Sequence, residues 1–124
     1  MKLSPAEETL MHHLWTAQKA FMKDLLEAYP EPKPAATTIA TLLKRMAEKG
    51  FVAYKEYGNS REYYPLISKN QYFTQHVNVL IKTFFNNSAS QFASFFTTET
   101  NLSGKELDEL KAIIEKEIQK KKEQ

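Results

Sequence analysis

Cysteine is absent from the 124 residues of this chain. Disulfides, thiolate metal sites and cysteine nucleophiles are therefore excluded, and the composition fits a reducing cytosol. The sequence also lacks any apolar run that approaches the ~20 residues a transmembrane helix needs. Its first residues, MKLSPAEETLMHHLW, carry polar side chains where a secretory signal has its apolar core. Together these absences predict a cytoplasmic protein that does not insert into membranes.

An excess of one charge is missing too, since 17 lysines and arginines face 15 aspartates and glutamates for a net charge of +2. Overall basicity therefore does not point to nucleic acid, and such a partner can be inferred only from where individual cations lie.

Sequence motifs of catalysis are also missing. No glycine-rich phosphate loop, His-Glu-x-x-His motif or nucleophile elbow occurs. His12 and His13 are adjacent, so on a helix they point in different directions and are poorly placed to share a metal ion. We interpret them, like His76, as structural or solvent-facing. We expect no catalytic residues, no metal site, no cofactor and no enzymatic activity.

Three serine-led capping boxes predict helix starts, because each serine is followed three residues later by a glutamate or glutamine. The boxes begin at Ser4, Ser68 and Ser103. Prolines 30, 32 and 34 end the second predicted helix. From the apolar spacing we expect helices over residues 5–15, 20–29 and 37–49, and three more after residues 68, 88 and 103.

The most informative stretch is residues 37–66, TTIATLLKRMAEKGFVAYKEYGNSREYYPL. A short amphipathic helix runs to Gly50, and two aromatic strands of alternating polarity follow, joined by Gly58-Asn59-Ser60. Helix, glycine and hairpin in this order are typical of a winged helix-turn-helix domain that binds DNA. The expected fold class is mainly α with a small β-hairpin.

Polar and cationic side chains lie on the predicted helix away from its apolar stripe, and two more cations flank the hairpin turn. Residues near the N-terminus of a helix in the major groove meet base edges first, and arginine suits guanine edges as well as phosphates. Lys44 and Arg45 alone would be interpreted as a solvated pair near a helix C-terminus, but the surrounding order of elements favours DNA binding. The predicted DNA-binding residues are Thr37, Thr38, Thr41, Lys44, Arg45, Lys55 and Arg61.

Four tyrosines on the hairpin have two interpretations. They could stack on unpaired bases, or they could pack across the strands, which we favour. They are Tyr54, Tyr57, Tyr63 and Tyr64.

After residue 67 the three predicted helices carry phenylalanines and isoleucines on wide apolar faces. Three short consecutive helices have too little surface in contact with one another to bury so much aromatic area. A second copy of the chain would cover it. We therefore expect an intertwined homodimer, with residues 1–67 as DNA-binding domain and 68–124 as dimerisation domain. The alternative is that these helices fold back on the N-terminal core. The predicted dimerisation residues are Phe73, Val77, Leu80, Phe84, Phe92, Phe95, Phe96, Leu107, Leu110 and Ile114.

Several motifs in combination resemble the penicillinase repressor family (BlaI/MecI), which shares its fold with the copper-responsive CopY repressors. The resemblance covers nearly the whole chain, and each motif alone would be weak. The motifs are LSPAE at residues 3–7, Leu14-Trp15, TIATLLKRM at 38–46, KGF at 49–51, YYPL at 63–66 and LSGKELDEL at 102–110.

This resemblance implies a homodimeric repressor whose winged helices each bind half of a dyad-symmetric operator in double-stranded DNA. It also implies induction by a membrane-bound sensor protease, which cleaves in the dimerisation region at the position of Phe95 and Phe96. The family often has asparagine where Phe95 stands, a basic residue in place of Ala40, and Trp-Ser-Pro-Lys in place of residues 34–37. The cysteine motif of the copper sensors is absent, which argues against copper sensing because Cu(I) prefers thiolates.

Two other classes of function stay open. The even charge balance is compatible with a winged helix that binds protein instead of DNA. The phenylalanine-rich C-terminal helices could hold a small-molecule pocket in a ligand-responsive regulator, although a dimer core explains these phenylalanines better.

Overall fold

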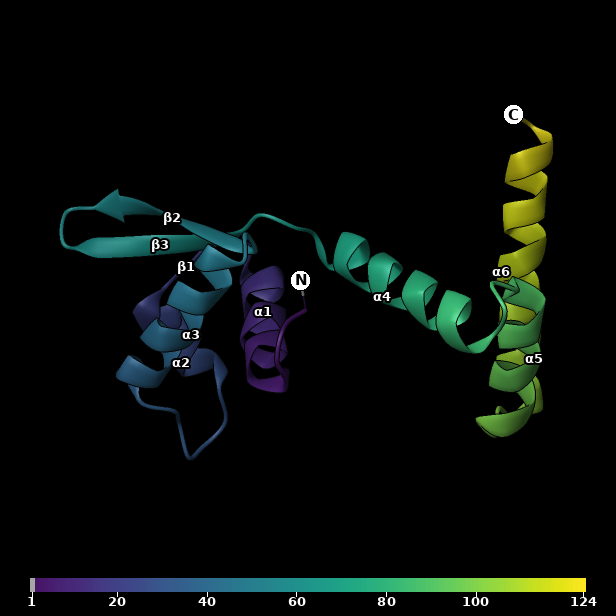
Figure 1. Cartoon of the computed structure of the whole chain (residues 1–124), viewed down its shortest axis with the longest axis horizontal. Coiled ribbons are helices and arrows are strands. Elements are labelled where there is room, and N and C mark those ends of the chain that lie inside the picture. The colour runs from purple at the N-terminus through teal and green to yellow at the C-terminus, as the bar shows by residue number, and fades with distance from the viewer. Residues whose placement is uncertain (1) are drawn as a thin grey trace. The chain divides into compact units, whose positions relative to one another are not determined.

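The computed structural model describes residues 2–124 as six α-helices and a three-stranded antiparallel sheet (Figure 1). The chain divides into two compact units, Met1–Gln75 and His76–Gln124, called here the N-terminal and C-terminal units. The expected class, mainly α with a small hairpin, is confirmed. The elements are α1 (Pro5–Ala17), β1 (Ala20–Phe21), α2 (Met22–Ala28), α3 (Ala36–Glu48), β2 (Val52–Tyr57), β3 (Ser60–Pro65), α4 (Lys69–Phe84), α5 (Ala89–Glu99) and α6 (Gly104–Lys122).

In the N-terminal unit, α1, α2 and α3 pack with the sheet around one apolar core. The strand order is β1-β3-β2. Figure 1 shows the β2–β3 hairpin extending past the three helices, as the wing of a winged helix-turn-helix does. Each helix contributes its apolar stripe to the core, whose largest fully buried side chains include Leu10, Met11, Leu14, Leu25, Ile39, Leu43, Met46 and Val52.

The second predicted helix begins later than expected. Ala20 and Phe21 pair with β3 as the short strand β1, and α2 begins at Met22. The backbone of Phe21 is extended, and its N–H donates to the carboxylate of Asp24 at 2.9 Å, which closes the first turn of α2. A two-residue strand is too short to show periodicity, so the apolar spacing did not reveal it.

All three predicted capping boxes are present. In each, the serine hydroxyl accepts from the backbone N–H three residues later, and the side chain of that residue accepts from the serine N–H. The pairs are Ser4–Glu7, Ser68–Gln71 and Ser103–Glu106.

The first turns of α4 belong to the N-terminal unit, which extends to Gln75. Tyr72 is 1% exposed, and its hydroxyl donates to Glu8 at 2.6 Å. The indole N–H of Trp15 donates to the carbonyl of Ile67 at 2.8 Å, and its ring lies 5.6 Å from that of Tyr72. The compact unit therefore ends later than residue 67, while the division into DNA-binding and dimerisation parts stays a prediction about function.

The C-terminal unit contains the end of α4 with α5 and α6. Phe85 contacts Phe92 and Phe95, with ring centroids 5.5 and 5.4 Å apart, and forms a small aromatic cluster. Asn86 and Asn87 turn the chain between α4 and α5 with φ of 53° and 57°, a conformation that asparagine tolerates. None of residues 76–124 is fully buried, so this unit lacks a closed core of its own.

Across residues 2–124, the helices fall short of the length and apolarity that crossing a bilayer demands.

Candidate nucleic-acid interface

Helix α3 presents a polar face to solvent because its apolar residues recur at helical spacing on the other side. Ile39, Leu43 and Met46 are buried. The five predicted DNA-binding residues of this helix are all exposed: Thr37, Thr38, Thr41, Lys44 and Arg45. The structure therefore brings them together on one accessible surface.

The N-terminus of α3 lacks a side-chain cap, since Ala35 occupies the N-cap position. Its positive dipole end and first N–H groups therefore have no capping side chain, an arrangement suited to a phosphate. The hydroxyl of Thr41 donates to the carbonyl of Thr37 at 3.0 Å. Thr41 can consequently accept a hydrogen bond from a base, or touch a thymine methyl with its own methyl group, without giving up that bond.

The other end of α3 is fixed by a Schellman motif. Gly50, with φ of 84°, follows the helix, and its N–H donates to the carbonyl of Ala47 at 3.0 Å. The N–H of Phe51 donates to the carbonyl of Met46 at 2.9 Å. The chain thus reverses directly into β2, which packs against α3.

A buried ion pair joins this end of α3 to α1. Nζ of Lys49 lies 2.7 Å from Oε1 of Glu7, and the Glu7 side chain is only 2% exposed. Burial raises the pKa of Glu7, but the bonds from Lys49 and Ser4 lower it by more, so the pKa lies below its ordinary value. Sequence reasoning found Glu7 only as a capping residue. No local pattern in the sequence indicates this pairing, because the two residues lie 42 positions apart.

The wing is formed by β2, β3 and their turn. Gly58 has φ of 61° at the first turn position, as a two-residue type II′ turn requires. The guanidinium of Arg61 lies 4.3 Å from the ring centroid of Tyr54, and Nζ of Lys55 lies 5.5 Å from that of Tyr57. Both predicted cations of the wing are therefore exposed and supported by aromatic rings.

Cross-strand packing of the wing tyrosines is found for two of the four. Tyr54 pairs with Tyr63 across the strands, with ring centroids 5.6 Å apart. Tyr57 contacts Phe21 of β1 at 6.0 Å. Interaction with Tyr63 first, and then with Tyr54, raises the pKa of the Arg61 guanidinium above its ordinary value.

Nine of the ten predicted dimerisation residues lie in the C-terminal unit. Phe73 instead lies in the N-terminal unit, with its ring 6.0 Å from that of Trp15 and 5.4 Å from that of Tyr72. Phe92 and Leu110 are half-buried. Seven of the nine remain exposed on the single chain: Val77, Leu80, Phe84, Phe95, Phe96, Leu107 and Ile114.

Within residues 2–124 no group of three or more histidine, aspartate or glutamate side chains is arranged to hold a metal ion.

The chain is similar to known repressors along nearly its whole length. It is 25% identical over 123 residues to the penicillinase repressor of Bacillus licheniformis, which covers 98% of this chain and 96% of that protein. It is 25% identical over 116 residues to the methicillin resistance regulatory protein MecI of Staphylococcus aureus (strain N315), with 93% and 94% covered. A solved CopR repressor structure is 26% identical, with a TM-score of 0.46, and covers 55% of this chain and 100% of that one. The family model for the penicillinase repressor matches residues 3–116, and the chain belongs to the penicillinase repressor family.

Proposed function

We propose that this protein is a homodimeric transcriptional repressor that binds a dyad-symmetric DNA operator. In each copy, residues 1–67 contact one half-site, with α3 in the major groove and the wing against the phosphate backbone. Residues 68–124 hold the two copies together. The exposed face of α3 supplies hydroxyls, a lysine and an arginine where a major-groove helix meets DNA.

The observation that carries the dimer is the apolar surface of the C-terminal unit. Its large side chains are far too exposed for a free chain in water, with Phe84 at 74%, Ile113 at 59% and Ile114 at 56%. Contiguous exposed apolar surface of this kind marks an interaction site. A second copy of the same surface is the simplest cover, because a two-fold interface uses one patch twice.

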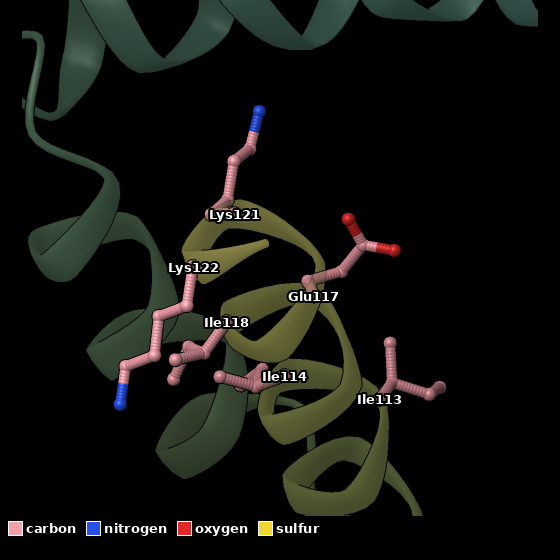
Figure 2. A pocket seen from close by; sticks show the side chains of 6 residues that line it. All are labelled: Ile113, Ile114, Glu117, Ile118, Lys121 and Lys122. Carbon is pink, nitrogen blue, oxygen red and sulfur yellow. The ribbon is translucent and has the colours of Figure 1, made fainter. Parts of the chain in front are cut away.

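A ligand pocket in the C-terminal helices is a weaker alternative. The hollow there is lined by α6 alone, and in Figure 2 Ile114 and Ile118 lie next to each other while Ile113 and Glu117 project away from them. Small-molecule sites are concave and enclose most of the ligand surface, whereas one helix offers a single wall. This arrangement favours a helix of another copy as the occupant. The lining residues are Ile113, Ile114, Glu117, Ile118, Lys121 and Lys122.

Release by proteolysis fits the position of Phe95 and Phe96, and it is part of the proposal. Both residues lie inside α5, and both are exposed, at 47% and 37%. A protease needs extended backbone, so α5 must open locally before cleavage. That opening costs little on the single chain, because α5 contains no buried residue. In the dimer the same opening would have to expose covered surface.

Two valines of α4 give a matched test of the dimer. Val77 lies on the predicted dimer face and is 42% exposed, whereas Val79 lies on the opposite side of the helix and is 64% exposed. At micromolar concentration, light scattering should give wild type and Val79→Asp twice the 14.4 kDa mass of one chain. Val77→Asp should give the monomer mass. A monomeric wild type would instead support the C-terminal helices folding back on the N-terminal core.

DNA binding is tested separately with a duplex that covers the region upstream of the protein's own gene. We expect the wild type to bind it more tightly than a mixed-sequence duplex of equal length. No affinity for either duplex at low salt would favour a winged helix that binds protein.

A further inference from the structure

A hollow of about 320 Å³ lies beside the wing, in the N-terminal unit. Aromatic and aliphatic side chains supply part of its lining, and the wing turn and the first turn of α2 supply the polar part. The lining residues are Phe21, Met22, Lys23, Asn59, Ser60, Arg61 and Tyr63. It was not foreseen from the sequence, because it depends on β1.

The register of β1 explains why two cations meet here. Phe21 pairs with Glu62 of β3, so the residues that follow Phe21 begin α2 next to the outer part of the wing. Lys23 comes two residues after that pair, and Arg61 is the neighbour of Glu62. Lys23 and Arg61 therefore line one hollow although they are far apart in sequence.

The two charged residues that line the hollow are both cations. Neither Lys23 nor Arg61 has a carboxylate within ion-pair distance in the described structure. The nearby Asp24 carboxylate already accepts the N–H of Phe21 at 2.9 Å. Glu56 stands opposite Arg61 in the strand register without forming an ion pair with it. Two cations with free donors thus face the same space.

Arg61 is held in place for binding by its surroundings. Its guanidinium lies 4.3 Å from the ring centroid of Tyr54. A guanidinium held in this way loses little conformational entropy when it forms a further bidentate hydrogen bond. Phosphate oxygens suit that bidentate geometry, and a lysine adds a point charge to it.

We propose that this hollow binds a backbone phosphate of DNA, with Lys23 and Arg61 as its two cationic contacts and Asn59 and Ser60 as polar neighbours. This inference rests on the proposed function, and it adds Lys23 on α2 as a positioning residue. It extends the contact from the wing tip to a second element, which fixes the rotation of the wing against the duplex. Contacts to phosphate position a protein but carry no sequence information.

Salt dependence of DNA binding tests Lys23 with a matched control. Each phosphate contact contributes about 0.9 to the slope of log Kobs against log salt concentration. Lys23→Gln should therefore make the slope shallower by about 1 for each protomer and weaken binding to specific and mixed-sequence duplexes equally. Lys23→Arg should keep the wild-type slope. Lys69→Gln, which removes an exposed lysine on α4 away from this hollow, should also keep it.

The outcomes separate this inference from the proposed function. A wild type that binds no duplex refutes the function itself. If the wild type binds DNA but Lys23→Gln and Lys69→Gln have equal slopes of log Kobs against log salt concentration, only the phosphate contact is refuted. Amide NMR shifts of Asn59 and Ser60 distinguish the source of the phosphate. We expect them to move with duplex DNA at micromolar concentration but not with inorganic phosphate at the same concentration, and saturation by inorganic phosphate would identify a free-anion site instead.

Discussion

Replacing Lys49 with methionine removes the cation from a carboxylate that cannot reach solvent. Oε1 of Glu7 would keep the N–H of Ser4 at 2.8 Å, whereas Oε2 is buried without a hydrogen-bond partner in the described structure. Breaking a fully buried pair costs about 3–5 kcal/mol in free energy of unfolding. Because Lys49 is itself 27% exposed, we expect Lys49→Met to cost about 2–3 kcal/mol at neutral pH.

The difference in unfolding free energy between the wild type and Lys49→Met should depend on pH. In the wild type the pKa of Glu7 is lowered, so the pair stabilises the fold above the unfolded-state pKa of about 4.3, and this contribution is lost as pH falls through the folded-state value. In Lys49→Met, burial dominates and the pKa of Glu7 rises, so protonation relieves the buried charge. The difference in stability between the two proteins should therefore shrink as pH falls from 7 towards 4.

Urea unfolding at fixed protein concentration, followed by Trp15 fluorescence, measures this difference. Trp15 is the single tryptophan and lies in the N-terminal unit, so its signal reports the unit that contains the pair. The double variant Glu7→Gln with Lys49→Met should be more stable than Lys49→Met alone, because the buried charge is gone and the amide oxygen of the new glutamine side chain can still cap α1. A constant difference between pH 7 and pH 4, or no recovery in the double variant, would refute a buried, ionised Glu7.

Further predictions concern α3 and the contact between α1 and the segment before α4. If Arg45 contacts a guanine, Arg45→Ala should cost about 1–3 kcal/mol of binding free energy and relax specificity at one base pair; equal losses on every duplex in gel-shift titrations would assign it to phosphate instead. Trp15→Phe removes the hydrogen bond to the carbonyl of Ile67, and we expect a loss of about 1–2 kcal/mol in free energy of unfolding. Unchanged urea unfolding, followed by circular dichroism, would contradict that value.

Features that depend on nearby residues were predictable from the sequence. The three capping boxes, the glycine that ends α3 and the wing turn each need only a few consecutive residues, and all are found where expected. The exposed face of α3 was predictable for the same reason, because helical spacing assigns sides. Helical spacing therefore predicted which residues of α3 are exposed, while their role in DNA binding stays a prediction.

Features that depend on distant pairing were not predictable in the same way. Lys49 and Glu7 are 42 positions apart, and each had a sufficient local explanation. Tyr72 lies within residues 68–124, the predicted dimerisation domain, yet it is 1% exposed and completes the N-terminal core. Local patterns identify which face is apolar but not which surface covers it. The β1 strand and the hollow beside Lys23 were not predicted for the same reason, because both depend on pairing between distant residues.

For the proposed repressor, the modest charge of the chain predicts that DNA binding depends strongly on dimerisation. Five cations per protomer are assigned to the interface: Lys23, Lys44, Arg45, Lys55 and Arg61. If all five contact phosphates, the slope of log Kobs against log salt concentration is at most about 4.5 for a monomer and about 9 for a dimer.

Val77→Asp separates these two cases, because Val77 lies in the C-terminal unit and its replacement leaves every assigned cation in place. We expect this variant to bind a duplex with half the wild-type slope and with much lower affinity at physiological salt. The matched Val79→Asp should retain both wild-type values. A monomeric Val77→Asp with the full wild-type slope would mean that one protomer makes all the phosphate contacts. The apolar surface of the C-terminal unit would then have a role other than raising affinity for DNA.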